Sequence, residues 1–323
     1  MDKKTKRILA LVSVVALIII SLASGTLKNK ELEQLQPKPE DYMVNILNNE
    51  KSTTYVARVG DMSQVIQKIS IDGTIDSSMT NRYSKNSVIN QIKQAKENDN
   101  VKAILLSINS PGGGVYESAE LYRELKNSGK DIYVSMKNIA ASGGYYISAP
   151  AKKIYANEET ITGSIGVVMR SVSAQKFFND HGIEEEVLRT GDLKAVGGTF
   201  ENLTPEAKKM HEEQMQASFD KFVSIVADGR HMTVDEVKKV ADGRTFRGNQ
   251  AVEAGLVDKI GTEDELIDYI KEDKGLSNPQ VQEIRVDKNA GNFLSSFFKT
   301  MVKSMLVETK NEIQNNEMSY LAR

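Results

Sequence analysis

The feature that most constrains the fold is a nearly unbroken apolar run in the middle of the chain, Ala103-Ile-Leu-Leu-Ser-Ile108. Central strands of a parallel sheet are covered on both faces, so they are apolar along their length rather than at every second residue. The run ends at Pro111-Gly-Gly-Gly114, and a helical pattern follows from about Tyr116 to Lys126. A strand, a glycine turn and a helix in this order predict a parallel sheet with helices packed on it.

The same alternation continues on both sides of this unit. Further strands are expected at residues 65–71, 131–136, 153–156, 166–169 and 185–188. Further helices are expected at residues 87–96, 174–180, 205–227, 233–240, 248–254 and 264–271, and one opens at Ala140-Ala-Ser-Gly-Gly144. Thr204 followed by Pro205, and Thr233 followed by Glu236, are typical helix starts. The sequence therefore predicts an α/β domain over residues 59–275.

The N-terminal segment predicts export of this domain. Residues 8–23 are apolar except for two serines, and the preceding Asp2-Lys-Lys-Thr-Lys-Arg7 is rich in cations. A long run with no polar face is typical of a transmembrane helix, and flanking cations stay in the cytoplasm. We interpret residues 1–7 as cytoplasmic, 8–27 as a transmembrane signal-anchor, and 28–58 as a polar stalk. A signal peptide cleaved near Ala23 is the alternative.

Composition limits the chemistry that is available to the chain. There is no cysteine, so disulfides, thiolate metal sites and a thiol nucleophile are excluded. With only three histidines, a histidine-rich metal site is not expected, and we expect neither a metal nor a cofactor. The net charge of −2 lacks the basic excess of a nucleic-acid-binding protein.

Two glycine-rich turns after strands are the candidate functional elements. The Pro111–Gly114 turn matches neither phosphate-binding nor dinucleotide-binding glycine motifs, so it is either a plain tight turn or a set of backbone donors for an oxyanion. Ser142 is either a simple helix cap or a nucleophile. A nucleophile needs a base, and His181, His211 and His231 all lie in polar surroundings. Lys194 has small and apolar neighbours, and a buried lysine can act as a base.

Several longer motifs occur in an order that resembles one family. They are Asn109-Ser-Pro-Gly-Gly-Gly-Val-Tyr-Glu-Ser118, Ser135-Met136 with Ala140-Ala-Ser-Gly-Gly-Tyr-Tyr146, Thr162-Gly-Ser-Ile-Gly166 and Gly191-Asp-Leu-Lys194. Over about residues 65–275 the chain resembles the signal peptide peptidases of serine protease family S49. The resemblance implies a ClpP/crotonase-like α/β fold and a membrane-bound serine endopeptidase that degrades signal peptides left after preprotein processing.

The resemblance also implies roles for particular residues. Ser142 resembles the nucleophile, Lys194 the general base, and Ser164 the hydroxyl that orients the lysine amine. The backbone of Gly112 and Gly113 resembles part of the oxyanion hole. The implied assembly is a homo-oligomeric ring, an octamer in this family, whose active sites are composed across subunits. The catalytic domain would stand outside the cell membrane, where its partners are signal-peptide remnants and the membrane, with no nucleic acid.

Alternatives remain at both the tail and the active site. Within residues 276–323, Phe293, Phe297, Met301 and Met305 recur at helical spacing. This tail could pack on protein, lie on a membrane surface, or reach an active site as a pseudo-substrate. The alternative functions are a Ser–His–Asp hydrolase that uses His181, an acyl-CoA enzyme of the crotonase type, and a non-catalytic membrane ring scaffold.

Overall fold

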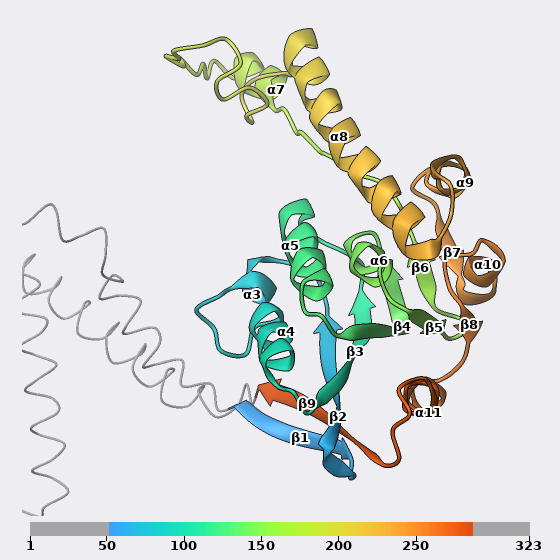
Figure 1. Ribbon diagram of the computed structural model, residues 1–323. Helices are drawn as coiled ribbons and strands as arrows, with labels where there is room; N and C mark the ends of the chain where they lie inside the picture. The colour runs from blue at the N-terminus through green and yellow to red at the C-terminus, as the bar shows by residue number, and fades with distance from the viewer. Residues whose placement is uncertain (1–51, 287–323) are drawn as a thin grey trace, which may run out of the picture. The chain divides into compact units, whose positions relative to one another are not determined.

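A nine-stranded mixed sheet forms the centre of the domain in a computed structural model, which describes residues 52–286 (Figure 1). The strands are β1 (Ser52–Arg58), β2 (Asp61–Asp72), β3 (Val101–Ser110), β4 (Asp131–Ala141), β5 (Lys153–Ala156), β6 (Ile161–Gly163), β7 (Thr245–Arg247), β8 (Lys259–Ile260) and β9 (Pro279–Val286). The helices are α3 (Ser77–Thr80), α4 (Val88–Glu97), α5 (Val115–Lys126), α6 (Gly143–Ser148), α7 (Gln175–Asp180), α8 (Pro205–Arg230), α9 (Val234–Val240), α10 (Gly248–Glu253) and α11 (Glu263–Asp273).

The apolar run that led the sequence analysis is the middle of this sheet. The strand order is β1-β9-β2-β3-β4-β5-β8, and β2, β3, β4 and β5 pair in parallel. Ile104, Leu106 and Ile108 point into one core, and Leu105 points into the other. Because side chains on both faces of β3 are buried, the strand is apolar at successive residues rather than at every second one. The predicted α/β architecture is confirmed.

The two faces of the sheet carry unequal layers of helix. On one face α4, α5 and α6 pack over the larger apolar core, whereas α11 covers the other face (Figure 1). Leu266, Ile267 and Ile270 of α11 meet Leu105 and Tyr133 there. The parallel strands end on the side where α5 and α6 begin, so the turns after β3 and β4 meet at one edge.

Helix α8 departs from the body of the domain. Thr204 caps it by accepting a hydrogen bond from Ala207, and Pro205 is its first residue, as the sequence predicts. Its C-terminal half is packed into the core through Phe222, Val223 and Val226, whereas its N-terminal half extends outward beside α7 (Figure 1). We call residues 167–215 the arm.

Several segments differ from the expected secondary structure, and the short elements α3, β6, β7 and β8 were not expected at all. The predictions of strands at residues 166–169 and 185–188 were wrong, since neither segment joins the sheet and most of their side chains are exposed. Residues 52–58, expected within the stalk, form β1, and residues 279–286, expected within the tail, include β9. These two strands pair antiparallel at one edge of the sheet, where β1 is largely exposed and shows no apolar periodicity.

The expected anchor at 8–27, most of the stalk and the amphipathic tail after residue 286 lie outside the described residues. Among residues 52–286, no helix combines the length and apolar character that crossing a membrane requires.

Candidate active site

Ser142 lies at a sharp turn between β4 and α6. Its backbone has φ 52° and ψ −119°, a conformation that is rare for a residue with a side chain. The Ser142 N–H donates to the carbonyl of Gly163 (2.9 Å), and its own carbonyl accepts from Tyr146 (2.8 Å). Although Ser142 occupies the cap position of α6, its hydroxyl makes no capping hydrogen bond. The hydroxyl therefore remains available for chemistry, and backbone strain of this kind is typical of functional sites.

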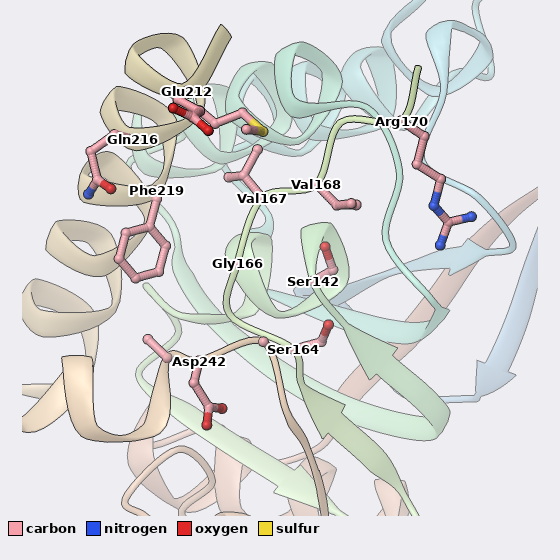
Figure 2. Close-up of a pocket in the computed structure, with 13 residues that line it drawn as sticks. Ser142, Ser164, Gly166, Val167, Val168, Arg170, Glu212, Gln216, Phe219 and Asp242 are labelled. Atoms are coloured by element: carbon pink, nitrogen blue, oxygen red, sulfur yellow. The ribbon is translucent and has the colours of Figure 1, made fainter. Parts of the chain in front are cut away.

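Sheet register brings Ser164 beside Ser142. Strands β4 and β6 run in parallel with Ala141 opposite Gly163, so the two serines follow paired residues. Ser164 also has a positive φ, 50°, and its N–H donates to Arg244 O (2.8 Å). Both serines line the same pocket (Figure 2). The structure thus brings together two residues that are 22 positions apart in the sequence.

The glycine turn after β3 packs directly against the Ser142 turn. A Cβ atom on Gly112 would lie 2.8 Å from Ser142 Cβ and 2.7 Å from Gly143 N. Gly113 forms a bridge to Ile75, and a Cβ there would lie only 2.0 Å from the Ile75 carbonyl oxygen. Neither position has room for a side chain, which is the physical reason that this turn is built from glycine.

Two backbone donors in this region are left without a partner. Within residues 52–286, the hydrogen bonds of the turn do not use the N–H of Gly113 or of Gly143, whereas the Gly112 N–H donates to Ser110 Oγ (3.1 Å). A Cβ on Gly143 would lie 3.2 Å from Gly113 N, so the two donors are close neighbours. A pair of free N–H groups beside a serine hydroxyl is the arrangement that stabilises an oxyanion.

An open pocket of about 760 Å³ extends from the two serines to α8 (Figure 2). Its walls combine apolar side chains with a few charges. The lining residues are Ser142, Ser164, Gly166, Val167, Val168, Arg170, Glu212, Met215, Gln216, Phe219, Ala241, Asp242 and Gly243. Hydrogen bonds from Arg244 lower the pKa of Asp242 to about 2, so this carboxylate stays charged and paired.

A second pocket, of about 30 Å³, adjoins Ser142 on the other side. Gly113 and Gly143 form part of its wall, and apolar atoms of Val115, Val167 and Phe222 form much of the rest. Burial raises the pKa of Tyr146, which also lines it, so the phenol stays protonated. A cavity of this size accepts only a small group.

The base predicted from the sequence is not part of these pockets. Lys194 follows a turn in the arm, where its N–H donates to Gly191 O (2.9 Å), and its side chain is exposed. It does not line the cavity that holds Ser142 and Ser164. The structure of a single chain therefore brings Ser142, Ser164, Gly112 and Gly113 together but leaves Lys194 apart.

The histidines, like Lys194, do not line the pockets that contain Ser142. His181 Nδ1 lies 2.8 Å from the Phe177 carbonyl oxygen, and its ring packs on the Phe177 ring at 4.4 Å. His231 has a left-handed backbone at the end of α8, and His211 lies on α8. Neither pocket that contains Ser142 is lined by a histidine. Within residues 52–286, no group of three or more histidine or acidic side chains is placed to hold a metal ion.

Comparison with known proteins places this site in a family. The family model "Peptidase family S49" matches residues 124–277, and the model "Clp protease" matches residues 57–161. A protein from Enterococcus faecium that bears the name signal peptide peptidase SppA is 40% identical over 237 residues, which cover 71% of this chain and 69% of the relative. The chain belongs to peptidase family S49.

Other relatives agree with this assignment. A Synechocystis protein named as a protease is 37% identical over 67% of this chain and 77% of its own length. A Methanocaldococcus jannaschii protein named as a protease is 33% identical over 65% of this chain and 68% of its own length. The α/β sheet is consistent with the Clp-protease-like group of folds.

One candidate donor of this site, Gly143, was not expected from the sequence. The family resemblance implies Gly112 and Gly113 as oxyanion donors, but the Gly112 N–H donates to Ser110 Oγ, whereas the Gly143 N–H has no partner within residues 52–286. The sequence does hold a signal for Gly143, because it directly follows the candidate nucleophile and opens a helix. The first N–H groups of a helix have no partner within the helix, so they are available to an anion.

Proposed function

We propose that this S49 peptidase is a membrane-anchored serine endopeptidase that uses Ser142 and Lys194 to degrade signal-peptide remnants. The observation that carries the proposal is the strained Ser142 turn, with its free hydroxyl beside the unpaired N–H groups of Gly113 and Gly143. These features support nucleophilic attack on a carbonyl carbon and stabilisation of the resulting oxyanion.

The proposed reaction proceeds in two halves. The neutral amine of Lys194 takes the proton of Ser142 as Oγ attacks the peptide carbonyl, and the N–H groups of Gly113 and Gly143 hold the oxyanion. Protonated Lys194 gives its proton to the leaving amine, and an acyl-enzyme remains. Water then attacks the acyl group, Ser142 recovers its proton, and the second peptide fragment leaves. Ser164 is proposed to orient the lysine amine.

We propose that Lys194 is supplied by a neighbouring copy of the chain. The arm carries Lys194 away from its own Ser142, and it exposes large apolar side chains that a single chain leaves uncovered. They include Phe177, Ile183, Val187 and Leu188. Contact between such surfaces would bury apolar area and desolvate the lysine, which a lysine base requires. A head-to-tail contact of this kind forms a closed ring when the rotation from one copy to the next is a whole fraction of a turn, and we propose that it does so here.

The substrate proposal rests on the pockets and on the N-terminal segment. The mostly apolar cavity of about 30 Å³, together with the apolar side chains in the mixed lining of the large pocket, suits a chain of apolar and small side chains, as in the hydrophobic region of a signal peptide. The apolar residues 8–27 would hold the catalytic domain at the outer face of the membrane, where such remnants stay.

Mixing two inactive variants tests the shared active site. Ser142→Ala and Lys194→Ala should each abolish cleavage of a quenched fluorescent peptide, while Lys176→Ala, also on the arm, should cleave like wild type. If each site takes its serine from one subunit and its lysine from the next, a randomly assembled equal mixture restores about a quarter of wild-type activity. Complete inactivity of a mixture shown to contain mixed oligomers would refute the shared site. Turnover by pure Ser142→Ala would refute the proposed nucleophile.

A further inference from the structure

Arg170 is an unusual arginine in this domain. Residues 52–286 contain nine arginines, and eight of them lie within 4.0 Å of a carboxylate oxygen. Arg170 is the exception, and within the same residues it makes no side-chain hydrogen bond. It lines the large pocket that contains Ser142.

The charges of this pocket are distributed unevenly. Figure 2 shows Glu212 and Gln216 on the α8 side and Arg170 on the opposite side of Ser142. Asp242 is paired with Arg244, whose guanidinium lies 2.8 Å from a carboxylate oxygen through Nε. Arg170 is therefore the cationic side chain among the residues that line this pocket, and within residues 52–286 it forms no ion pair with a carboxylate.

We infer that Arg170 recognises the free C-terminal carboxylate of a peptide bound across Ser142. A guanidinium binds a carboxylate through two parallel hydrogen bonds, and it needs no further charge to do so. The walls between Arg170 and α8 are apolar at Val167, Val168 and Phe219, so the pocket fits an apolar chain that ends in a carboxylate. This inference deepens the proposed function and rests on it, because a processed signal peptide has such an end.

The effect on binding is moderate because Arg170 is exposed. Exposed ion pairs are screened by water and salt, whereas a bidentate geometry strengthens them. We expect the free acid of a peptide to bind about threefold to tenfold more tightly than its C-terminal amide. The ratio should shrink as salt rises from about 50 mM to about 500 mM.

The test uses full-length protein carrying Ser142→Ala, which binds without cleaving. An apolar peptide with a fluorophore at its N-terminus is made as the free acid and as the amide, and both dissociation constants are measured by anisotropy. Arg170→Gln should bring the ratio of the two constants to about one, and Arg170→Lys should keep part of it. Arg123→Gln is the matched control, since Arg123 is exposed on α5 and lies outside the pocket. It should leave the ratio unchanged.

Three results would overturn the inference: equal binding of acid and amide, a ratio that persists in Arg170→Gln, or no binding of either peptide. Cleavage by protein with an intact Ser142 separates this inference from the proposed function. Selective binding of the acid without any cleavage would refute the peptidase proposal and leave the role of Arg170 standing. Cleavage by this protein, together with equal binding of the acid and the amide, would support the peptidase proposal and refute the role of Arg170.

Discussion

Replacing Gly113 with alanine should damage both the stability of the domain and the reactivity of Ser142. The new Cβ atom would lie 2.0 Å from Ile75 O, which is backbone and cannot rotate away. Gly113 is not among the residues with positive φ, so the cost is steric rather than conformational. To reach ordinary contact, the Gly113 turn and the Ile75 segment must separate by more than about 1 Å.

The magnitude follows from the contacts that this separation breaks. Ile75 N–H donates to Gly112 O and Gly114 N–H donates to Ile75 O, both at 2.9 Å. Each such bond contributes about 1 kcal/mol net, and forcing an extra carbon into a packed site costs about 1–3 kcal/mol. The free energy of unfolding should fall by about 3–5 kcal/mol, which lowers the melting temperature by roughly 6–20 °C. Displacing the Gly113 N–H should slow acylation of Ser142 about a hundredfold.

Gly114→Ala is the matched control for this experiment. Its Cβ would meet only the carboxylate end of Glu117, a flexible side chain that can move aside. We expect a loss of about 1 kcal/mol, because alanine is a poorer helix cap than glycine. Urea unfolding and the rate of labelling by a fluorophosphonate measure the two effects. If Gly113→Ala were as stable as Gly114→Ala and labelled at the wild-type rate, the reasoning about this turn would be refuted.

Two further predictions concern pH and specificity. Burial of Glu263 opposes its charged form, but ion pairs with Lys137 (2.6 Å) and Lys68 (2.7 Å) outweigh it and lower its pKa. Glu263→Gln should therefore lower the free energy of unfolding, measured with urea at pH 7, by about 1–3 kcal/mol. This difference should disappear as pH falls through the lowered pKa of Glu263, and a difference that does not vary with pH would contradict the prediction. Val167→Ala enlarges the small pocket and should shift cleavage of a peptide library roughly tenfold toward larger side chains; an unchanged preference would show that the pocket holds no substrate side chain.

The sheet was predictable because its central strands are buried on both faces. The apolar run from Ala103 to Ile108 indicates a strand that is buried on both faces. The glycine-rich turns after β3 and β4 could then be placed at the ends of neighbouring strands. Strand β1 was not predictable in the same way. It lies at an edge, its side chains are largely exposed, and its pairing partner β9 is more than 200 positions away in the sequence.

In the arm, the sequence predicts strands that the structure does not contain. Residues 166–169 and 185–188 are apolar enough to suggest strands, yet they form none, and Val168 and Leu188 are exposed. An apolar pattern indicates that side chains are buried, but it does not distinguish burial in a sheet of the same chain from burial against another molecule. The same distinction applies to the residues of the candidate site. Ser142 and Ser164 meet because two strands of one chain are in register, whereas the position of Lys194 depends on contacts beyond the single chain.

The most direct test of the central claim is covalent labelling of the full-length protein with a fluorophosphonate, followed by mass spectrometry of the modified peptide. We predict that the wild-type protein is labelled at Ser142, that labelling is lost in Ser142→Ala, and that it is strongly slowed in Lys194→Ala. His181→Ala should be labelled at the wild-type rate. Labelling at another serine, or loss of labelling in His181→Ala but not in Lys194→Ala, would contradict the account.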